Sequence, residues 1–207
     1  MRIGLVPISA KPYHAGHHAL VTKAAQENDE VLLYVSIKTR ARKGELPIKG
    51  SDMQQIWREH IEDILPGNVT PVYGGSPVRQ VYNVLQDANE KAADGTLEHV
   101  YTVYSDPADT AQNFSDANRQ KYFPDVYDAG NVQFSAEVDP AGMTRGAGTP
   151  DVSGTAVREF IKCGDFESFA ASMPAELDSE AVYNTLCPVA PKSESYLRDY
   201  IFEIIKG

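Results

Sequence analysis

Two hydrophobic patterns alternate along the first part of the chain. The run Ile3–Val6 is continuously apolar, and so is Val31–Ile37, as is typical of strands that are covered on both faces. Between these runs, apolar residues recur at the three-and-four spacing of one helix face, together with one histidine: His17, Leu20, Val21, Ala24 and Ala25. The pattern predicts a unit of strand, helix and strand.

The same alternation continues to the middle of the sequence. Three more strands are predicted, at Val69–Tyr73, His99–Tyr104 and Val132–Val138. One helix should open at Ser51, with Gln54 completing a capping box, and run to Ile64, and another should run from Pro77 to Ala92. Residues 107–130 read as irregular or weakly helical. Repeated strand–helix–strand units predict an α/β fold, with a Rossmann-like, doubly wound parallel sheet.

The last part of the chain has only helical patterns. Asp165 should cap a helix over 166–170, Asp178 or Ser179 one over 182–186, and Ser193 opens a final apolar stripe. We therefore expect a main domain over 1–162 and a C-terminal helical extension over 163–207 that packs on it. The final stripe fits either a core or a seam between copies of the chain, so a homo-oligomer stays open.

Composition narrows the class of protein. The 207 residues are 42% hydrophobic, enough for one domain with a core. There is no signal-peptide pattern, and no run approaches the roughly 20 apolar residues of a membrane span, so we expect no membrane association and a cytoplasmic location. The two cysteines, Cys163 and Cys187, form no Cys-x-x-Cys pair, which favours buried or incidental thiols over a disulfide scaffold or zinc site.

The charge balance argues against nucleic-acid binding. With 19 basic and 29 acidic residues the formal net charge is -10, whereas an extended nucleic-acid contact needs a basic face. A single basic island interrupts this pattern and contains only one acid, Glu45; its members are Lys38, Arg40, Arg42, Lys43 and Lys49. We interpret the island as a solvated loop or as a mobile flap over phosphates, with Arg40, Arg42 and Lys43 as candidate phosphate ligands.

The candidate chemistry begins where the first strand ends. The stretch from Ser9 to His17 places His14 and His17 at the start of the first helix, and Gly16 lets a ligand approach the backbone. Free amides at a helix N-terminus favour an anion, and an imidazole can add a hydrogen bond to it. A metal pair is less favoured because the stretch has no Cys, Asp or Glu to complete a ligand set.

A second anion site is predicted downstream. Ser153 is a natural N-cap after a Gly- and Pro-rich loop, and Gly154 and Thr155 keep that helix end small. Arg158 adds a positive charge one turn later. Alone, this pattern fits an ordinary capped helix with a surface arginine; paired with the first stretch, it indicates a second phosphate clamp. Asp106, after the fourth strand, fits either a plain turn or a contact to ribose or base.

These residues carry a family resemblance. Lys11-Pro12-Tyr13-His14-Ala15-Gly16-His17 resembles the signature of the HIGH-motif nucleotidyltransferases, and the stretch Val152 to Arg158 resembles their C-terminal Ser-x-Thr-x-x-Arg motif. The resemblance implies transfer of a nucleotidyl group from a nucleoside triphosphate, accompanied by Mg²⁺. It gives His14 and His17 the role of transition-state ligands, with Lys11 beside them, and assigns the nucleotide phosphates to Ser9, Gly16, Ser153, Gly154, Thr155 and Arg158.

Among subfamilies, the chain is most similar to the archaeal-type nicotinamide-nucleotide adenylyltransferases. The similarity rests on Met143-Thr144-Arg145 followed by the Ser153 motif, and it adds Arg145 to the substrate ligands. It implies ATP and a small phosphorylated acceptor, nicotinamide mononucleotide, as partners. Trp57, Tyr73 and Tyr104 are candidates to stack on the nicotinamide ring, although Trp57 on a helix face fits a core position equally well.

One departure from the subfamily pattern keeps the acceptor open. Where those enzymes have Gly-Arg-Phe-Gln-Pro, this chain has Ile8-Ser9-Ala10-Lys11-Pro12, so the arginine that would contact phosphate is absent and Lys11 is a candidate to supply its charge. Pantetheine-phosphate adenylyltransferase, FAD synthetase and cytidylyltransferase activities remain alternatives, as does a nucleotide-binding module without turnover. An aminoacyl-tRNA synthetase is disfavoured because the chain is short and acidic and has no Lys-Met-Ser-Lys-Ser signature.

Overall fold

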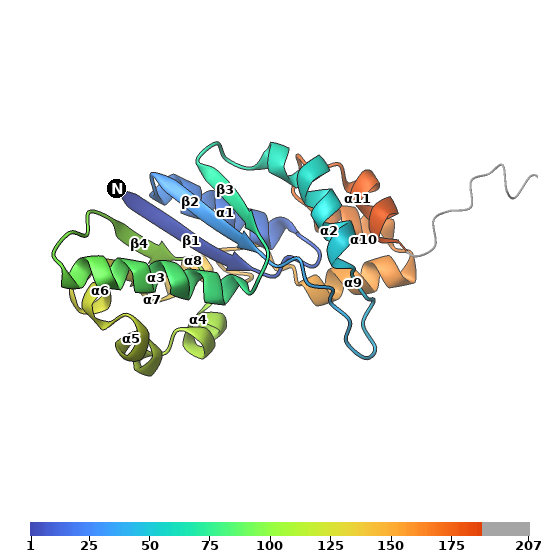
Figure 1. Ribbon diagram of the computed structural model, residues 1–207. Helices are drawn as coiled ribbons and strands as arrows, with labels where there is room; N and C mark the ends of the chain where they lie inside the picture. The colour runs from blue at the N-terminus through green and yellow to red at the C-terminus, as the bar shows by residue number, and fades with distance from the viewer. Residues whose placement is uncertain (188–207) are drawn as a thin grey trace, which may run out of the picture.

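Five parallel strands form the centre of the molecule in the computed structural model, which describes residues 1–187 (Figure 1). The strands are β1 (Arg2–Ile8), β2 (Glu30–Val35), β3 (Val69–Tyr73), β4 (Val100–Val103) and β5 (Val132–Phe134). Their order in the sheet is β3-β2-β1-β4-β5, and every neighbouring pair is parallel. The predicted Rossmann-like α/β fold is confirmed.

Helices cover both faces of this sheet (Figure 1). One face carries α1 (Ala15–Glu27), α2 (Gly50–Ile56), the π turn η1 (Trp57–Ile61), the 3-10 turn η2 (Glu62–Ile64), α9 (Gly154–Cys163), α10 (Phe166–Ala171) and α11 (Ser179–Leu186). The other carries α3 (Pro77–Ala93), α4 (Pro107–Asn113), α5 (Asp116–Tyr122) and α6 (Pro124–Asp128). Two short helices, α7 (Ser135–Val138) and α8 (Pro140–Met143), lead from β5 toward α9.

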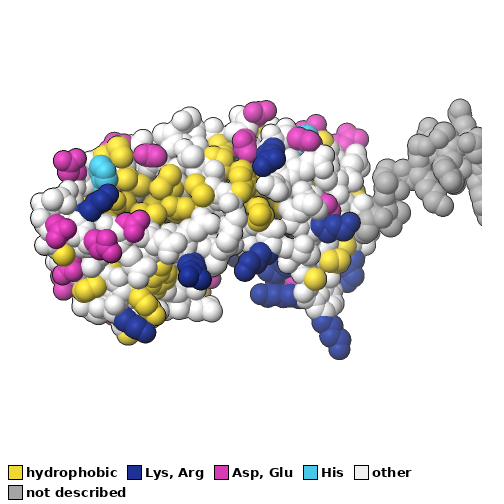
Figure 2. All heavy atoms as spheres, viewed as in Figure 1, with side chains coloured by type: hydrophobic (Ala, Val, Ile, Leu, Met, Phe, Trp, Pro, Cys, Tyr) yellow, Lys and Arg dark blue, Asp and Glu magenta, His cyan; other side chains and the backbone are white. Residues whose placement is uncertain are grey.

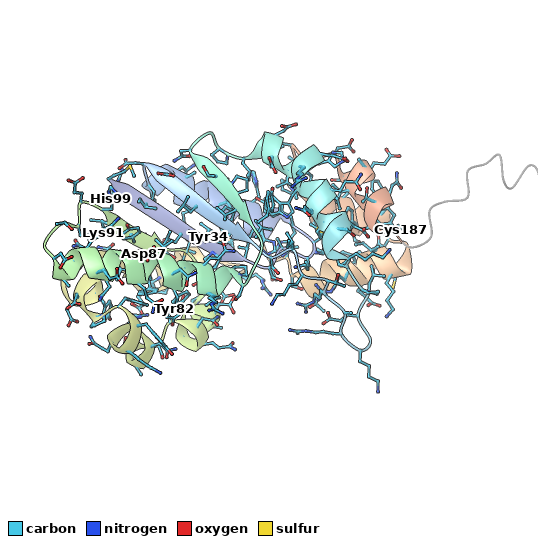
Figure 3. The ribbon with its side chains drawn as sticks, in the orientation of Figure 1. Tyr34, Tyr82, Asp87, Lys91, His99 and Cys187 are labelled. Carbon is cyan, nitrogen blue, oxygen red and sulfur yellow. The ribbon has the colours of Figure 1, made fainter. Side chains whose placement is uncertain are left out.

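The alternating side chains of the strands create a core on each face. Leu33 of β2 faces α1 and the C-terminal helices, whereas its neighbour Tyr34 faces α3 (Figure 3). Both side chains are buried. Burying one large apolar side chain contributes about 1.5–3 kcal/mol, so these two layers account for most of the driving force that holds the sheet and its helices together.

The described part of the C-terminal extension belongs to the first of these cores. Phe169, Val182 and Leu186 are buried in the same cluster as β1, β2 and α1. Asp165 and Asp178 cap α10 and α11 as predicted, because their carboxylates accept from Ser168 N and Ala181 N at 3.0 Å. The predicted helix that opens at Ser193 lies outside the described residues.

Two predicted elements need correction. The fifth strand ends at Phe134, since Ser135 turns its hydroxyl to the Val103 carbonyl at 3.0 Å and begins α7. Ser51 does not cap α2, because its hydroxyl bonds to Asp52 and Lys49 occupies the N-cap position. Of the two alternatives for the segment over 107–130, the helical one is confirmed, since it forms α4, α5 and α6. Short helices of this kind carry too little periodicity for the sequence to set their bounds.

The order of the strands creates a switch point. From β1 the chain moves outward to β2 and β3, and it then crosses back to β4 on the other side of β1. The loops that follow β1 and β4 therefore leave the carboxyl edge of the sheet in opposite directions, which opens a crevice between them. Parallel α/β sheets bind ligands at such a crevice.

None of the helices within residues 1–187 is long and apolar enough to cross a membrane. Cys163 is exposed and Cys187 is half-buried, so neither is the fully buried thiol that the sequence suggested as one alternative.

Candidate functional site

A cleft of about 330 Å³ opens at the carboxyl edge of the sheet, at the switch point between β1 and β4. Its volume lies at the lower end of the range for small-molecule sites. The predicted site residues that line it are Ser9, Lys11, His14, Gly16, His17, Arg40, Asp106, Arg145, Ser153, Gly154, Thr155 and Arg158. The fold thus brings together segments that are far apart in the sequence.

His14 is the N-cap of α1. Its Nδ1 accepts a hydrogen bond of 3.1 Å from the backbone N–H of Gly16, and the ring is 5% exposed. In the neutral ring the proton must then be on Nε2, which becomes a donor. A Cβ at position 16 would lie 3.1 Å from this ring, so Gly16 leaves room for the imidazole to fold back over the helix end.

His17 lies one turn further along α1 and beside His14. The two ring centroids are 3.9 Å apart, and Tyr13 stacks on the other side of His17 at 5.7 Å. Tyr13 is itself fixed by Trp57, whose ring centroid is 5.0 Å away and whose side chain is buried. The orientation of His17 is therefore set by an aromatic stack that reaches into the core.

Both histidines are neutral near pH 7. Burial, followed by the charges of Arg145 and Arg158, lowers the pKa of His14 to about 4. Loss of solvent, followed by His14 and Arg145, lowers the pKa of His17 well below its usual value. Nδ1 of His17 is buried and has no hydrogen-bond partner within the described residues. Two neutral imidazoles beside arginines form a site that favours the binding of an anion.

Lys11 is held at the wall of the cleft. Its Nζ donates to the carbonyl and the hydroxyl of Ser36 at 2.8 and 3.0 Å, and the residue is 4% exposed. Burial, together with Arg40 and Lys38, lowers the pKa of Lys11 to about 8. The amine therefore remains mostly protonated at neutral pH, and it carries a positive charge between the ends of β1 and β2.

The second predicted motif forms the opposite wall. Ser153 caps α9, since its hydroxyl accepts from Ala156 N at 3.1 Å, as the sequence predicted. Arg158 lies one turn later and is 3% exposed, donating to the Lys11 carbonyl at 2.7 Å and to the Thr155 hydroxyl at 2.9 Å. A Cβ at Gly154 would lie 3.2 Å from Arg158 and 3.4 Å from the Lys11 carbonyl. Arg158 thus joins the two motifs.

This arrangement excludes the alternative in which Arg158 is only a surface arginine on a capped helix. The side chain is buried, and one of its contacts is an ion pair with Glu45 at 3.0 Å. Glu45 also accepts from Nε of Arg40 at 2.9 Å and from Nη2 of Arg40 at 3.3 Å. These bonds, that from Arg40 above all, lower the pKa of the Glu45 carboxyl below its usual range.

Two predicted phosphate ligands are not in the cleft. Arg42 and Lys43 are exposed at the tip of a hairpin, where Glu45 N bonds to the Arg42 carbonyl at 3.1 Å and Gly44 has a φ of 86°. The antiparallel pairing of Arg40 with Ile48 closes the hairpin. Figure 2 shows Lys and Arg side chains gathered around it at the lower right. In this conformation only Arg40 of the three reaches the cleft.

Acidic groups lie on the β4 side of the cleft. Asp106 caps α4 by accepting from Asp109 N at 2.8 Å, which accounts for one of its carboxylate oxygens. Loss of solvent and the neighbouring Asp106 raise the pKa of Asp109, while Arg145 opposes this rise. Arg145 thus lies within electrostatic reach of Asp109 and of both histidines.

The aromatic residues proposed to stack on a nicotinamide ring do not line the cleft. Trp57 and Tyr104 are each 1% exposed and are packed in the core, and Tyr73 packs against Trp57 at 6.1 Å. His99, just before β4, lies at the far end of the sheet (Figure 3). A ring of the acceptor would have to contact other groups.

A divalent cation has limited ligands in the described part of the chain. Residues 1–187 contain no group of three or more His, Cys, Asp or Glu side chains that could hold a metal ion. Mg²⁺, however, is commonly bound through substrate phosphates and only one or two carboxylates. Asp106 and Asp109 are the carboxylates that line the cleft, so the donor set fits a magnesium ion that arrives with a triphosphate.

Two acids escaped the sequence interpretation. Asp109 belongs to the stretch after the fourth strand that fits either a turn or a contact to ribose or base and is not singled out there, and Glu45 enters only as the single acid in the basic island. Glu45 is the residue that links Arg40 to Arg158, and a lone carboxylate among five cations was the signal that could have pointed to it. Asp109 lies three residues after the N-cap Asp106, which is a common place for a helix-start acid.

The cleft can therefore hold an extended anion. The N-termini of α1 and α9, two neutral imidazoles and several cations converge on it. Binding of this kind requires no nucleophilic side chain.

No protein-family model matches the chain, and no curated protein matches it either.

Proposed function

We propose that the protein is a nucleotidyltransferase that moves the AMP moiety of ATP onto a small phosphate-bearing acceptor and releases pyrophosphate. The observation that carries the proposal is the pairing of His14 and His17, with ring centroids 3.9 Å apart, at the N-terminus of α1, opposite the α9 end that holds Arg158. Together with the resemblance of both motifs to the HIGH-motif family, this arrangement supports phosphoryl chemistry.

In this reaction an oxygen of the acceptor phosphate attacks the α-phosphorus of ATP. The bond from that phosphorus to the bridging oxygen breaks, and pyrophosphate carries the electron pair away. No covalent intermediate on the protein is required, because alignment of the two anions and stabilisation of the growing charge supply the catalysis. Magnesium bound to the triphosphate would neutralise part of its charge.

The residues of the cleft have distinct parts in this proposal. Nε2 of His14 and of His17 would donate to oxygens on which charge grows, since neutral imidazoles remain donors without repelling Arg145 or Arg158. The amides at Ser153 to Thr155 would hold the outer phosphates. Lys11, between β1 and β2, would add a positive charge near the α-phosphate.

Nicotinamide mononucleotide, giving NAD, is the acceptor that we propose first. Its support is the resemblance around Arg145 and Ser153, and Arg145 lines the cleft beside the histidines. The buried positions of Trp57 and Tyr104 remove one argument for it. A cytidylyltransferase, a pantetheine-phosphate adenylyltransferase and an FAD synthetase remain as alternatives.

A matrix of substrates tests the proposal. ATP and CTP are each incubated with nicotinamide mononucleotide, phosphopantetheine, flavin mononucleotide and glycerol phosphate in the presence of Mg²⁺, and pyrophosphate release is measured. We expect release with ATP and nicotinamide mononucleotide, together with NAD. Turnover with CTP alone would keep the class and change the substrates. Tight ATP binding with no turnover for any acceptor would instead support a nucleotide-binding module.

A further inference from the structure

Glu45 contacts two arginines of the cleft without lining the cleft itself. Its carboxylate bonds to Arg40 at 2.9 and 3.3 Å and pairs with Arg158 at 3.0 Å. Both arginines line the cleft, whereas Glu45 does not. Two of the three guanidinium groups that line the cleft, those of Arg40 and Arg158, are therefore already bound to an anion of the protein.

A carboxylate and a phosphate compete for the same guanidinium geometry. Arginine binds either group through parallel N–H bonds, and these charge-assisted bonds are stronger than neutral ones. A ligand phosphate that takes up these donors must offset the loss of their bonds to Glu45. Because Arg158 is also held by the Lys11 carbonyl and the Thr155 hydroxyl, it cannot move far to serve both partners.

The side chain of Glu45 can leave the arginines while the hairpin itself stays folded. The strands of the hairpin are fixed by bonds of 2.9 Å in both directions between Arg40 and Ile48, and Ile48 is buried. Glu45 follows the tight turn at Gly44, and its side chain is 22% exposed. Solvent can therefore receive the carboxylate if a ligand displaces it.

We propose that Glu45 is a specificity-determining residue that makes the cleft select polyphosphate chains over monophosphates. The inference rests on the proposed function. A monophosphate gains little beyond the contacts that Glu45 already makes with the arginines. A triphosphate is long enough to bind the histidines and the N-termini of α1 and α9 while Glu45 keeps its bonds to the arginines, so the cost of displacing the carboxylate falls on the monophosphate alone. Glu45 thereby keeps free phosphate, and the phosphate of the acceptor, out of the ATP position.

Calorimetric titration with inorganic phosphate and with tripolyphosphate tests this role without any turnover. Glu45→Gln is compared with the wild type and with Glu137→Gln, a matched control in which the carboxylate partner of another buried arginine, Arg119, is removed outside the cleft. We expect Glu45→Gln to strengthen phosphate binding about tenfold, the scale of one charge-assisted hydrogen bond, and tripolyphosphate binding by less. Glu137→Gln should leave both affinities unchanged.

The outcomes separate this inference from the proposed function. A smaller ratio of tripolyphosphate affinity to phosphate affinity in Glu45→Gln, but not in Glu137→Gln, supports the role of Glu45. This holds even if no acceptor is ever adenylylated. Equal weakening of both anions in Glu45→Gln would overturn it and make Glu45 a residue that positions the arginines. A wild-type protein that binds tripolyphosphate but turns over no nucleotide would contradict the proposed function and leave the role of Glu45 standing.

Discussion

Replacing His14 with asparagine should change how the stability of the protein depends on pH. Folding lowers the pKa of His14 from its unfolded value of 6.5 to about 4. Between these values the unfolded chain binds a proton that the folded chain does not, so the free energy of unfolding must fall as the pH is lowered through this window. Above pH 6.5 the effect vanishes.

The size of the effect follows from the shift. One pKa unit corresponds to about 1.4 kcal/mol, so the shift of His14 should cost the wild type about 3 kcal/mol of stability between pH 6.5 and 4. His14 is 5% exposed, and solvent screening therefore reduces this value little. For a domain of marginal stability this is a large fraction of the total.

Asparagine is the informative replacement because it retains the cap. Its amide oxygen can accept from Gly16 N–H as Nδ1 of His14 does, and asparagine is among the best N-cap residues. His17 and the carboxylates with lowered pKa values are present in both proteins, so their contributions largely cancel in the difference.

Urea unfolding at a series of pH values from 7.5 to 4.5 measures the effect. At pH 7.5 we expect the two proteins to have similar free energies of unfolding. At pH 4.5 the wild type should have lost at least ~2 kcal/mol more of this free energy than His14→Asn. If the two proteins lose stability in parallel, His14 is not buried as a neutral ring, and the argument for a neutral donor in the cleft fails with it.

Three other variants test the site and its frame. His17→Ala should lower kcat by about two orders of magnitude with little change in thermal stability, as measured by steady-state pyrophosphate release. Arg158→Ala should weaken ATP more than the acceptor in calorimetric titrations, because the clamp faces the outer phosphates. Arg119→Ala should cost about 3 kcal/mol in urea unfolding, since its guanidinium bonds to Phe114, Tyr127 and Glu137, yet it should leave ATP affinity unchanged.

Each of these variants has an outcome that contradicts its reasoning. An effect of His17→Ala on KM alone would place the ring in ground-state binding. Unchanged ATP affinity in Arg158→Ala would reduce the second motif to a capped helix that happens to hold the Lys11 carbonyl. Unchanged stability in Arg119→Ala would mean that its bonds to Phe114, Tyr127 and Glu137 are replaced by water at no cost.

The sequence was a good guide wherever a long pattern or a cap decided the structure. The continuous apolar runs located β1 and β2, and the serine and aspartates before α9, α10 and α11 are N-caps whose side chains accept from the backbone three residues on. Because strand ends of a parallel sheet meet at one edge, the residues after β1 and β4 line the same cleft.

Tertiary contacts decided what the sequence could not show. Arg158 reads as a surface residue from its helix position, and only the folded chain places the Lys11 carbonyl and Glu45 against it. Trp57 and Tyr104 read equally well as ligand platforms or as core. Val138 fits a strand pattern, yet it is 70% exposed at the end of a helical turn, since β5 has no further partner residue on β4.

The stack of Trp57, Tyr13 and His17 gives the protein an internal optical reporter. Trp57 is the single tryptophan in the sequence, and it lies at the core end of a line of rings whose other end faces the cleft. Any ligand that turns or charges the imidazole of His17 changes the surroundings of Tyr13 and, through it, of the indole. The fluorescence emission of the unlabelled protein should therefore follow occupancy of the cleft. Ligands that have no chromophore and are not converted to a product can then be titrated by fluorescence alone.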